Sequence, residues 1–599
     1  MDRRLLLAIG LMFGVIVVTN LLFPPRRPEA PISAADTARV QQVSPEAGLS
    51  TGQGEEASAA QPPAGEDAGL REPAPAAVAA TREARVDTLV VETPLLRLGF
   101  VTRGAQLVSL ELPRYKSYEP ADPEGASVQL VRGGDHLFGF RVAAGPDTVD
   151  LSERRFEASA RRVRLDEGTP RDSLTFRYSF ASGERGPIVF RVTYHFEAHS
   201  YQVRVEGAFE GIGGRGYTLY TSLGTGLRTN EVNPKEDFGQ LAFVVKGRRG
   251  GIRSEKLSTV DSGEVTAPAG GPFDWVAVKN KYFVAAYLAP PQSPGFGGLV
   301  VTGLPEEHSA RITATLPVPA GDPSFAFEAY FGPQDYGRLK AIGHDLQNVN
   351  PVGWGWLQPV IRPLVAIVMG ILTWMHTTLS LAYGWVLILF GVLMRIVLFP
   401  LYQKSMRAQM GQMQVQPLMK DIREKYKDDP QKMQQEIMRL YKEHGINPLA
   451  GCLPMMLPFP VLITLFFVFQ NTIEFRGVPF LWLPDLSLKD PLYMVPLAMG
   501  ASMFVLMWMG QRGMESTAQT KMMTYGMPIF MTFLFVNFPS GLNLYYTTSN
   551  IASLPQQFYI ARERRKVRGS MPSAGSSGAM EGGGAKKGGH KRKRSSPKR

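Results

Sequence analysis

The sequence predicts a polytopic α-helical membrane protein that also carries a separate all-β domain. Apolar stretches predict the membrane part, because four segments after Pro351 carry almost no formal charge: 363–403, 445–473, 491–511 and 522–561. Residues 86–340 predict the β part, since short runs of alternating apolar and polar residues lie between Gly, Pro and Asp clusters. The mean hydropathy of −0.07 therefore averages a polar half and an apolar half.

Most of the net positive charge belongs to the C-terminal tail, residues 561–599. From position 562 onwards there are 13 basic and 2 acidic side chains, and the preceding 561 residues hold 52 basic against 51 acidic side chains. A basic arm beside a membrane binds anionic lipid or RNA, and the sequence leaves both open. The single cysteine, Cys452, excludes an internal disulfide and a Cys-built metal site, and no cofactor is expected.

The first expected element is a membrane anchor, residues 1–23. Residues 5–23 are uncharged and follow Arg3 and Arg4, and as a helix they span roughly 28 Å, close to a hydrocarbon core of about 30 Å. A cleaved secretory signal is the alternative, but no small-x-small cleavage site follows the apolar stretch. Residues 24–85 are rich in Pro, Ala, Glu, Gly and Ser, which predicts a disordered tether.

Residues 86–340 are predicted to form an antiparallel β-sandwich. Several segments alternate at the period of a strand: 86–91, 175–180, 189–196 and 201–205. Many short strands at this spacing are typical of a sandwich. An amphipathic helical pattern is expected only near Tyr336–Leu346.

Five further membrane spans are expected, at about 382–402, 453–470, 491–510, 522–537 and 541–560. The last two divide an uncharged run of 40 residues at the turn signal Asn537-Phe-Pro-Ser-Gly541. Residues 403–444 hold nine Lys or Arg, whereas residues 474–490 hold two. The positive-inside rule and six spans in total therefore predict cytoplasmic termini, with residues 24–350 on the opposite side.

The loop 403–444 is predicted to be a cytoplasmic helical hairpin. Its helical composition is interrupted at Lys427-Asp-Asp-Pro430, where Asp429 can cap a second helix that has Pro430 at its first position. The alternative is a solvated linker that only stiffens the connection.

Arg395 is the most informative candidate for a functional residue. It lies nine residues before Lys404, which places it about 13 Å from the cytoplasmic end of its helix, near mid-membrane. A guanidinium group there costs on the order of 2.5–3.5 kcal/mol, and it cannot lose its charge. We therefore expect a wet or polar cavity around Arg395; a snorkelling or structural arginine is the alternative.

Polar residues on the last predicted span form one stripe. The offsets of 4, 3 and 7 residues put Asn543, Thr547, Asn550 and Gln557 on one helix face. The stripe serves either as interhelical hydrogen bonding or as a polar lining opposite Arg395. The spans contain no acidic residue and the chain has no GxxxxGK[ST] loop, which argues against proton-coupled transport and nucleotide hydrolysis.

Long segments of the chain resemble the YidC membrane-protein insertases of the Oxa/YidC/Alb superfamily. The most specific matches are Met394-Arg395 with Phe399-Pro400-Leu401, REKYKDDPQKMQQEIMRLYKEHGINPLAGCLPMMLPFP at 423–460, VPFLWLPDLSLKDPLYMVPLAMG at 478–500 and FPSGLNLYYTTSN at 538–550. WVAVKNKYF at 275–283 and YFGPQDY at 330–336 match more weakly.

The resemblance implies a bacterial inner-membrane protein with a periplasmic β-super-sandwich at 86–340 and a five-helix insertase core at 351–560. It also implies an interfacial helix at about 353–366 and a hydrophilic groove that opens to cytoplasm and lipid. The groove contacts carried over are Arg395, Asn543, Tyr546, Thr547 and Asn550. The implied function is insertion and folding of newly made membrane proteins without enzymatic chemistry, alone or with the Sec translocon. The implied partners are nascent membrane proteins, that translocon, the ribosome and anionic lipids.

Two positions depart from the family pattern. Gly391 stands where Thr is common, and Pro458 stands where Gln is common, so the groove is expected to be less polar here. A channel or small-solute transporter is the main alternative function. A sugar-handling enzyme is a second alternative, because His136, His195, His199 and His308 are available without a local motif that pairs any of them with an acid.

Overall fold

The computed structural model describes residues 88–180, 188–212, 214–306, 309–350, 358–445, 459–511 and 518–569. The expected anchor 1–23, the tether 24–85 and residues 570–599 of the tail lie outside the described residues.

The first part of the described chain is a β-rich domain of three sheets. The nine-stranded sheet has the order β14 (Ile252–Lys256), β13 (Ala242–Gly247), β16 (Phe273–Lys279), β17 (Phe283–Leu288), β20 (Ser324–Pro333), β11 (Gln202–Glu210), β10 (Ile188–Glu197), β9 (Arg171–Phe180) and β7 (Glu157–Ala158). The six-stranded sheet has the order β15 (Val265–Thr266), β18 (Gly298–Gly303), β19 (Ala310–Val318), β12 (Tyr217–Ser222), β5 (Phe138–Ala144) and β6 (Asp147–Asp150). The five-stranded sheet has the order β4 (Ser127–Gln129), β3 (Gln106–Lys116), β2 (Arg97–Val101), β1 (Thr88–Glu92) and β8 (Arg162–Arg164).

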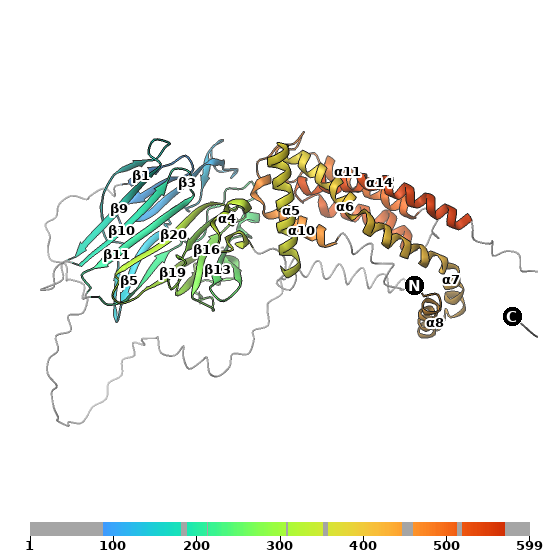
Figure 1. Cartoon of the computed structure of the whole chain (residues 1–599), viewed down its shortest axis with the longest axis horizontal. Helices are drawn as coiled ribbons and strands as arrows, with labels where there is room; N and C mark the ends of the chain where they lie inside the picture. The colour runs from blue at the N-terminus through green and yellow to red at the C-terminus, as the bar shows by residue number, and fades with distance from the viewer. Residues whose placement is uncertain are drawn as a thin grey trace, which may run out of the picture. The chain divides into compact units, whose positions relative to one another are not determined.

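The long strands β9, β10, β11 and β20 lie side by side in the nine-stranded sheet (Figure 1). Their residues alternate between the core and the outer face, as the period of two predicts; in β10, Phe190, Val192, Tyr194 and Phe196 are buried and the residues between them are more exposed. The described residues of the four segments that the sequence predicts as strands fall in β1, β9, β10 and β11, except Tyr201, which precedes β11; residues 86 and 87 are outside the described residues. Pairing is antiparallel except between β1 and β8.

One aromatic core joins the three sheets. The Phe138 ring of β5 lies 4.9 Å from Tyr194 of β10 and 5.4 Å from Tyr287 of β17, measured between ring centroids. Phe100 of β2 lies 4.8 Å from Tyr194. These side chains are fully buried, so the predicted β-rich domain is confirmed, and the burial of this large apolar area stabilises it.

Short helices flank the sheets. Helix α3 (Pro234–Phe238) interrupts the strands, and α4 (Tyr336–Ile342) follows the last one where the sequence predicts a helix. The Asp335 side chain caps α4 by accepting a hydrogen bond from the Arg338 amide at 2.8 Å. The short helix η3 (Leu346–Asn348) follows.

The second part of the described chain is helical. Its helices are α5 (Gln358–Leu379), α6 (Tyr383–Gln414), α7 (Gln416–Lys425), α8 (Pro430–Glu443), α10 (Phe459–Asn471), α11 (Met494–Gln511), α12 (Ala518–Lys521), η6 (Met522–Gly526), α13 (Met527–Phe535) and α14 (Ser540–Gly569). Helix α14 runs alongside both α6 and α11 (Figure 1). The one-turn helix η5 (Ile473–Phe475) follows α10.

Several helices differ in length from the expected elements. Helix α6 contains Pro400 and continues 12 residues beyond the predicted end at position 402, into the predicted hairpin. Helix α14 continues to Gly569 rather than ending at 560, and α5 extends to Leu379 rather than 366. Helices α6 and α14 continue because helix formers such as Gln and Arg follow without a proline, and α5 continues because the residues after 366 stay mostly apolar.

Three described helical segments are long and apolar enough to cross a membrane: Gln358–Leu379, Tyr383–Pro400 and Met494–Gln511. Two shorter apolar helical segments are Val461–Gln470 and Met522–Phe535. Helix α5 thus reaches the length and composition of a span, although the sequence predicts a short interfacial helix there. The count of six spans stays a prediction, because residues 5–23 are not described.

Candidate functional site

Arg395 lies on the face of α6 that packs against α14. The Phe390 and Tyr545 ring centroids are 5.8 Å apart, and a Cβ on Gly391 would lie 3.3 Å from the Thr548 side chain. Arg395 follows Gly391 by one helical turn, so it lies further along the same face. It is half-buried, whereas the next residue, Ile396, is 65% exposed.

Gly391 has a packing role. It is buried, and a side chain there would press on both Thr548 and the Tyr545 carbonyl oxygen. The absence of a Cβ therefore lets α6 and α14 approach closely just before Arg395. Thr548 brings a hydroxyl-bearing side chain to this seam from the opposite helix. Pro458, the other departure from the family pattern, lies outside the described residues.

Asn543 is fully buried at the turn between α13 and α14. Its Nδ2 atom donates a 3.0 Å hydrogen bond to the Phe535 carbonyl and lies 3.4 Å from the Phe538 carbonyl and 3.5 Å from the Pro539 carbonyl. The Phe535 carbonyl also accepts from the Phe538 amide, and the Pro539 carbonyl accepts from the Leu542 and Asn543 amides, so the Asn543 side chain adds to the backbone hydrogen bonds of this turn. The geometry gives Asn543 a turn-closing role in the interior of the bundle.

The rest of the polar stripe faces α11. The Asn550 Nδ2 atom donates to the Ser502 Oγ atom at 3.1 Å, and a Cβ on Gly510 would lie 3.9 Å from the Gln557 Oε1 atom. Thr547 donates to the Asn543 carbonyl within its own helix at 2.8 Å. The expectation that the stripe lies opposite Arg395 is therefore not met, because α14 turns its other face to α6.

Tyr546 lies at the edge of an aromatic group near the same turn. Its ring centroid is 5.2 Å from that of Phe535 and 5.6 Å from that of Tyr545. The side chain is half-buried, so it contributes packing between α13 and α14. Tyr546 therefore lies close to the turn between α13 and α14 that Asn543 closes.

Gln556 is a buried polar residue that the sequence reasoning missed. Tyr545, Thr548 and Gln556 are 3 and 8 residues apart, close to whole helical turns, so Gln556 continues the α14 stripe that meets α6. It is 7% exposed, and neither its Nε2 nor its Oε1 atom has a hydrogen-bond partner among the described residues. In the sequence, the offset of 8 residues from Thr548 places Gln556 near the same helix face. The polar stripe that begins at Asn543 is the one that the sequence suggested.

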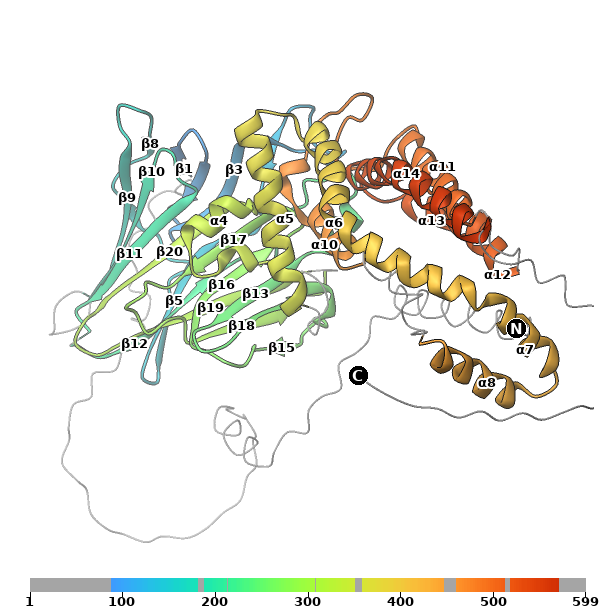
Figure 2. The same ribbon diagram turned by 45° about the vertical axis from the view of Figure 1, so that its right-hand side comes forward.

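The predicted hairpin exists as α7 and α8, which fold back beside one another (Figure 2). The Asp429 side chain caps α8 by accepting from the Lys432 amide at 3.1 Å, and Pro430 is its first residue, as predicted. The Tyr441 hydroxyl donates to the Met419 sulfur at 3.2 Å. Methionine and other apolar side chains thus hold the two helices together.

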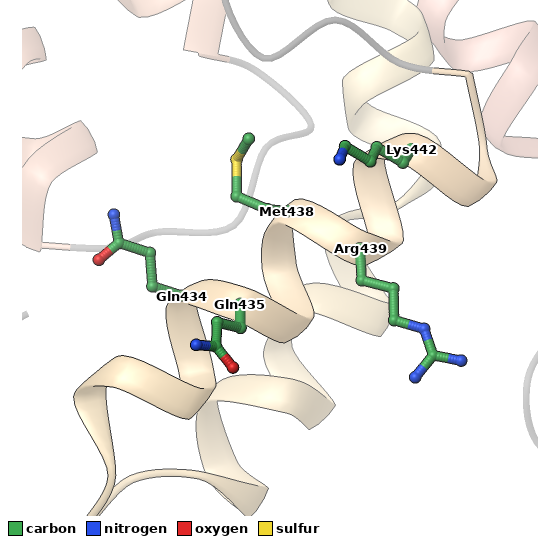
Figure 3. Close-up of a pocket in the computed structure, with 5 residues that line it drawn as sticks. All are labelled: Gln434, Gln435, Met438, Arg439 and Lys442. Carbon is green, nitrogen blue, oxygen red and sulfur yellow. The ribbon is translucent and has the colours of Figure 1, made fainter.

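The outer surface of α8 bears a shallow pocket. Gln434, Met438 and Lys442 form one row along the helix, and Gln435 and Arg439 form a second row (Figure 3). Met438 is 44% exposed. The pocket therefore combines an accessible apolar side chain with two positive charges.

The loop after α10 inserts into the sheet domain. Arg476 Nε lies 2.8 Å from Glu231 Oε1, and the two side chains are only 3% and 9% exposed. The Arg476 guanidinium also stacks 4.6 Å from the Tyr118 ring centroid. Ile473 joins the core of the sheet domain, whereas Phe475 joins the core of the helices.

Burial raises the pKa of two carboxyl groups near this contact, one in the sheet domain and one in the loop. Desolvation raises the pKa of Glu231 to about 7, although the Arg476 guanidinium and Lys281 pull it down. Desolvation, with the nearby Asp335 carboxylate, raises the pKa of Glu474 to about 7. Among the described residues, no group of three or more His, Cys, Asp or Glu side chains could hold a metal ion.

Comparison with known proteins gives the family. Residues 88–367 match the family described as "YidC periplasmic domain", and residues 345–567 match that described as "60Kd inner membrane protein". The insertase YidC of Chlorobium phaeovibrioides is 32% identical over 81% of this chain and 85% of its own length. This chain belongs to the YidC family of membrane protein insertases. YidC relatives from Chlorobium luteolum and Citrifermentans bemidjiense are 30% and 32% identical, over 94% of this chain and 95% and 99% of their own lengths.

Membership of the YidC family makes this chain an inner-membrane protein with a periplasmic domain and a role in membrane protein insertion. YidC proteins are insertases rather than enzymes, which sets aside the sugar-handling alternative.

In the sheet domain, His195 Nε2 lies 3.4 Å from the Glu206 carboxylate on an exposed face, with both side chains at least 40% exposed. His308 lies outside the described residues.

Proposed function

We propose that this protein inserts newly made membrane proteins along the seam between α6 and α14, with Arg395 as its polar contact. The single observation that carries the proposal is Arg395 itself, which continues the Gly391 face toward α14 within an otherwise uncharged apolar segment. Holding a permanently charged guanidinium at that depth costs free energy, which polar surroundings lower.

The physical task is to move a polar flank of a client across hydrocarbon. Each unsatisfied polar group costs several kcal/mol in that medium. A polar seam that reaches from the cytoplasm toward mid-membrane shortens the dry path, and Arg395 attracts acidic client residues. The client's apolar span then leaves sideways into lipid, where burial stabilises it by about 25 cal/mol per Å².

Polar side chains on α14 support this seam. Thr548 and Gln556 lie on the stripe that meets α6, and Gln556 has no hydrogen-bond partner among the described residues. Asn543, Tyr546, Thr547 and Asn550 then act as a supporting layer that fixes α14 against α11 and α13. The groove is thus formed by fewer polar residues than the family resemblance implies.

One apolar helical segment of the bundle is shorter than the thickness of the hydrocarbon core. The apolar segment Met522–Phe535 has 14 residues, or about 21 Å as a helix, well below a hydrocarbon core of about 30 Å. Local bilayer thinning around such a short segment lowers the barrier for a polar flank further.

The proposed topology has six spans with both termini in the cytoplasm. The hairpin α7–α8 and the basic tail then face the ribosome and the anionic lipid surface. Arg439, Lys442 and Met438 supply charge and apolar area on α8 for such a partner (Figure 3). Cooperation with the Sec translocon and a chaperone role during folding belong to the same proposal.

Reconstitution tests the proposal directly. Purified protein in liposomes is expected to integrate a small single-span membrane protein without ATP, as protease protection of the client measures. Empty liposomes and liposomes with Arg395→Ala protein are the controls. Solute flux without client integration would instead support the channel or transporter alternative.

A further inference from the structure

A small cavity lies where the sheet domain meets the helices. Its volume is about 60 Å³, and its lining comes from the segment 334–350 on one side and from α5, the end of α10 and Glu474 on the other. A bound water needs at least about 10–15 Å³ of such space. The cavity therefore has room for at least two water molecules.

Four polar atoms that line this cavity have no hydrogen-bond partner among the described residues. They are Gln334 Oε1, Gln347 Oε1, Asn350 Nδ2 and Glu474 Oε2. Buried polar groups are nearly always satisfied by protein or by ordered water. Four such atoms around one cavity therefore indicate a ligand that both donates and accepts hydrogen bonds.

The orientation of Gln334 is fixed by its other amide atom. Gln334 is 6% exposed, and its Nε2 atom donates to the Asn280 carbonyl at 2.9 Å and to the Phe283 carbonyl at 3.0 Å. A rotated amide would set an oxygen against two carbonyl oxygens, so Oε1 has to point the other way. A nine-tenths buried acceptor is thus aimed at the cavity by direct bonds.

We propose that this cavity is a hydration site, in which a pair of water molecules bridges the segment 334–350 to Glu474 of the loop after α10, beside apolar side chains of α5 and α10. Two waters supply four O–H donors, which is enough for the three acceptor atoms and for one bond between the waters. Their lone pairs accept from Asn350 Nδ2. All four polar atoms then have a hydrogen-bond partner, and no side chain has to move.

A cation fits this cavity less well than water. Asn350 Nδ2 presents its hydrogen atoms to the cavity, and this positive edge repels a metal ion. Glu474 is the one carboxylate in the lining, whereas hard cations in proteins collect about six to eight oxygen ligands. Water alone satisfies donor and acceptors together.

Bridging water gives the junction a specific mechanical property. A water molecule can reorient and keep its bonds when its partners shift slightly, and it costs only about 0–2 kcal/mol to hold. The Arg476–Glu231 ion pair is a direct contact nearby, whereas this seam can adjust. The site does not depend on the insertase role.

The test is a structure of the full-length protein in lipid nanodiscs at a resolution that shows ordered water, with variants Glu474→Gln and Glu474→Leu. We expect two peaks within about 2.6–3.2 Å of the four polar atoms. Glu474→Gln should retain both peaks, because its amide keeps an acceptor in place, and Glu474→Leu should lose at least one. Glu443→Gln on the exposed face of α8 is the matched control.

Two outcomes would overturn the proposal. One is a dry cavity in which the polar side chains have turned to bond each other. The other is a single peak surrounded by oxygens at about 2.3–2.6 Å, which would be a cation. If Glu474→Leu does not fold, the wild-type and Glu474→Gln structures decide alone.

Discussion

Arg476 of the loop after α10 forms a buried ion pair with Glu231 of the sheet domain, with 2.8 Å between Nε and Oε1. The Arg476 guanidinium also donates to the carbonyls of Lys116 and Asn230, at 2.9 and 3.2 Å. One side chain from the helical half of the chain thus satisfies three acceptors in the sheet domain. Removing one partner of a buried pair leaves the other charge without compensation.

We expect Arg476→Met to destabilise the protein by about 3–5 kcal/mol, because Glu231 would remain buried without its cation. Thermal unfolding of the purified protein in detergent would show this as a lower Tm. The control is Arg439→Met, which breaks a solvent-exposed pair with Glu443 on α8; because exposed pairs contribute little to stability, this Tm should change little. Adding Glu231→Leu to Arg476→Met should recover part of the lost stability. Equal Tm values for Arg476→Met and Arg439→Met would contradict the prediction.

The pH dependence of stability should reflect Glu474. Its folded pKa is raised from 4.5 to about 7, so the folded state keeps a proton that the unfolded state has lost. Its contribution therefore makes stability fall as pH rises between 4.5 and 7. The measurement compares Tm at about pH 5 and about pH 8 for wild type and Glu474→Gln. The variant should lose less stability over this interval, and an unchanged difference would argue against a raised pKa.

Insertion should depend on the charge at position 395. Arg395→Ala is expected to reduce insertion of clients that have acidic flanks, whereas Arg395→Lys should retain much of the activity, since the attraction requires only a positive charge. Protease protection of the client in liposomes measures both. Normal insertion of every client by Arg395→Ala would remove Arg395 from the mechanism.

Gln556 and its neighbour Gln557 offer a matched pair on different faces of α14, because consecutive residues of a helix are about 100° apart. Gln556 continues the stripe toward α6, whereas Gln557 lies on the side of Gly510 in α11. We expect Gln556→Leu to lower insertion several-fold, because it removes a polar group from the proposed path, and Gln557→Leu to have a smaller effect. A photo-crosslinker at 556 should also capture the client. Equal loss from both variants would indicate a general packing defect.

Close packing of α11 on α13 should be sensitive to one methyl group. A Cβ on Gly500 would clash with the Thr532 Oγ1 atom, which donates to the Pro528 carbonyl at 2.8 Å. We expect Gly500→Ala to lower the Tm by a few degrees, in keeping with an overpacking cost of about 1–3 kcal/mol. Thr532→Ala should relieve most of this loss in the double variant. Additive losses would show that the two residues are not coupled.

Local patterns predicted the elements of this protein well. The period-two alternation of residues 189–196 predicted β10, and the Asp429-Pro430 signal predicted the start of α8. The length of the apolar runs predicted α11 within three residues at each end. Such features depend on backbone geometry and short-range caps, which neighbouring residues specify.

The sequence alone determined that an arginine lies within an apolar helix and that polar residues share one face of the last helix. Only the tertiary structure decided which neighbour each face meets. Gly391 brings α6 against the Thr548 side of α14, so the stripe of Asn550 turns to Ser502 of α11 instead of Arg395. Helical periodicity fixes which residues share a face but not its rotation toward a partner, because close packing between helices far apart in the sequence sets that rotation.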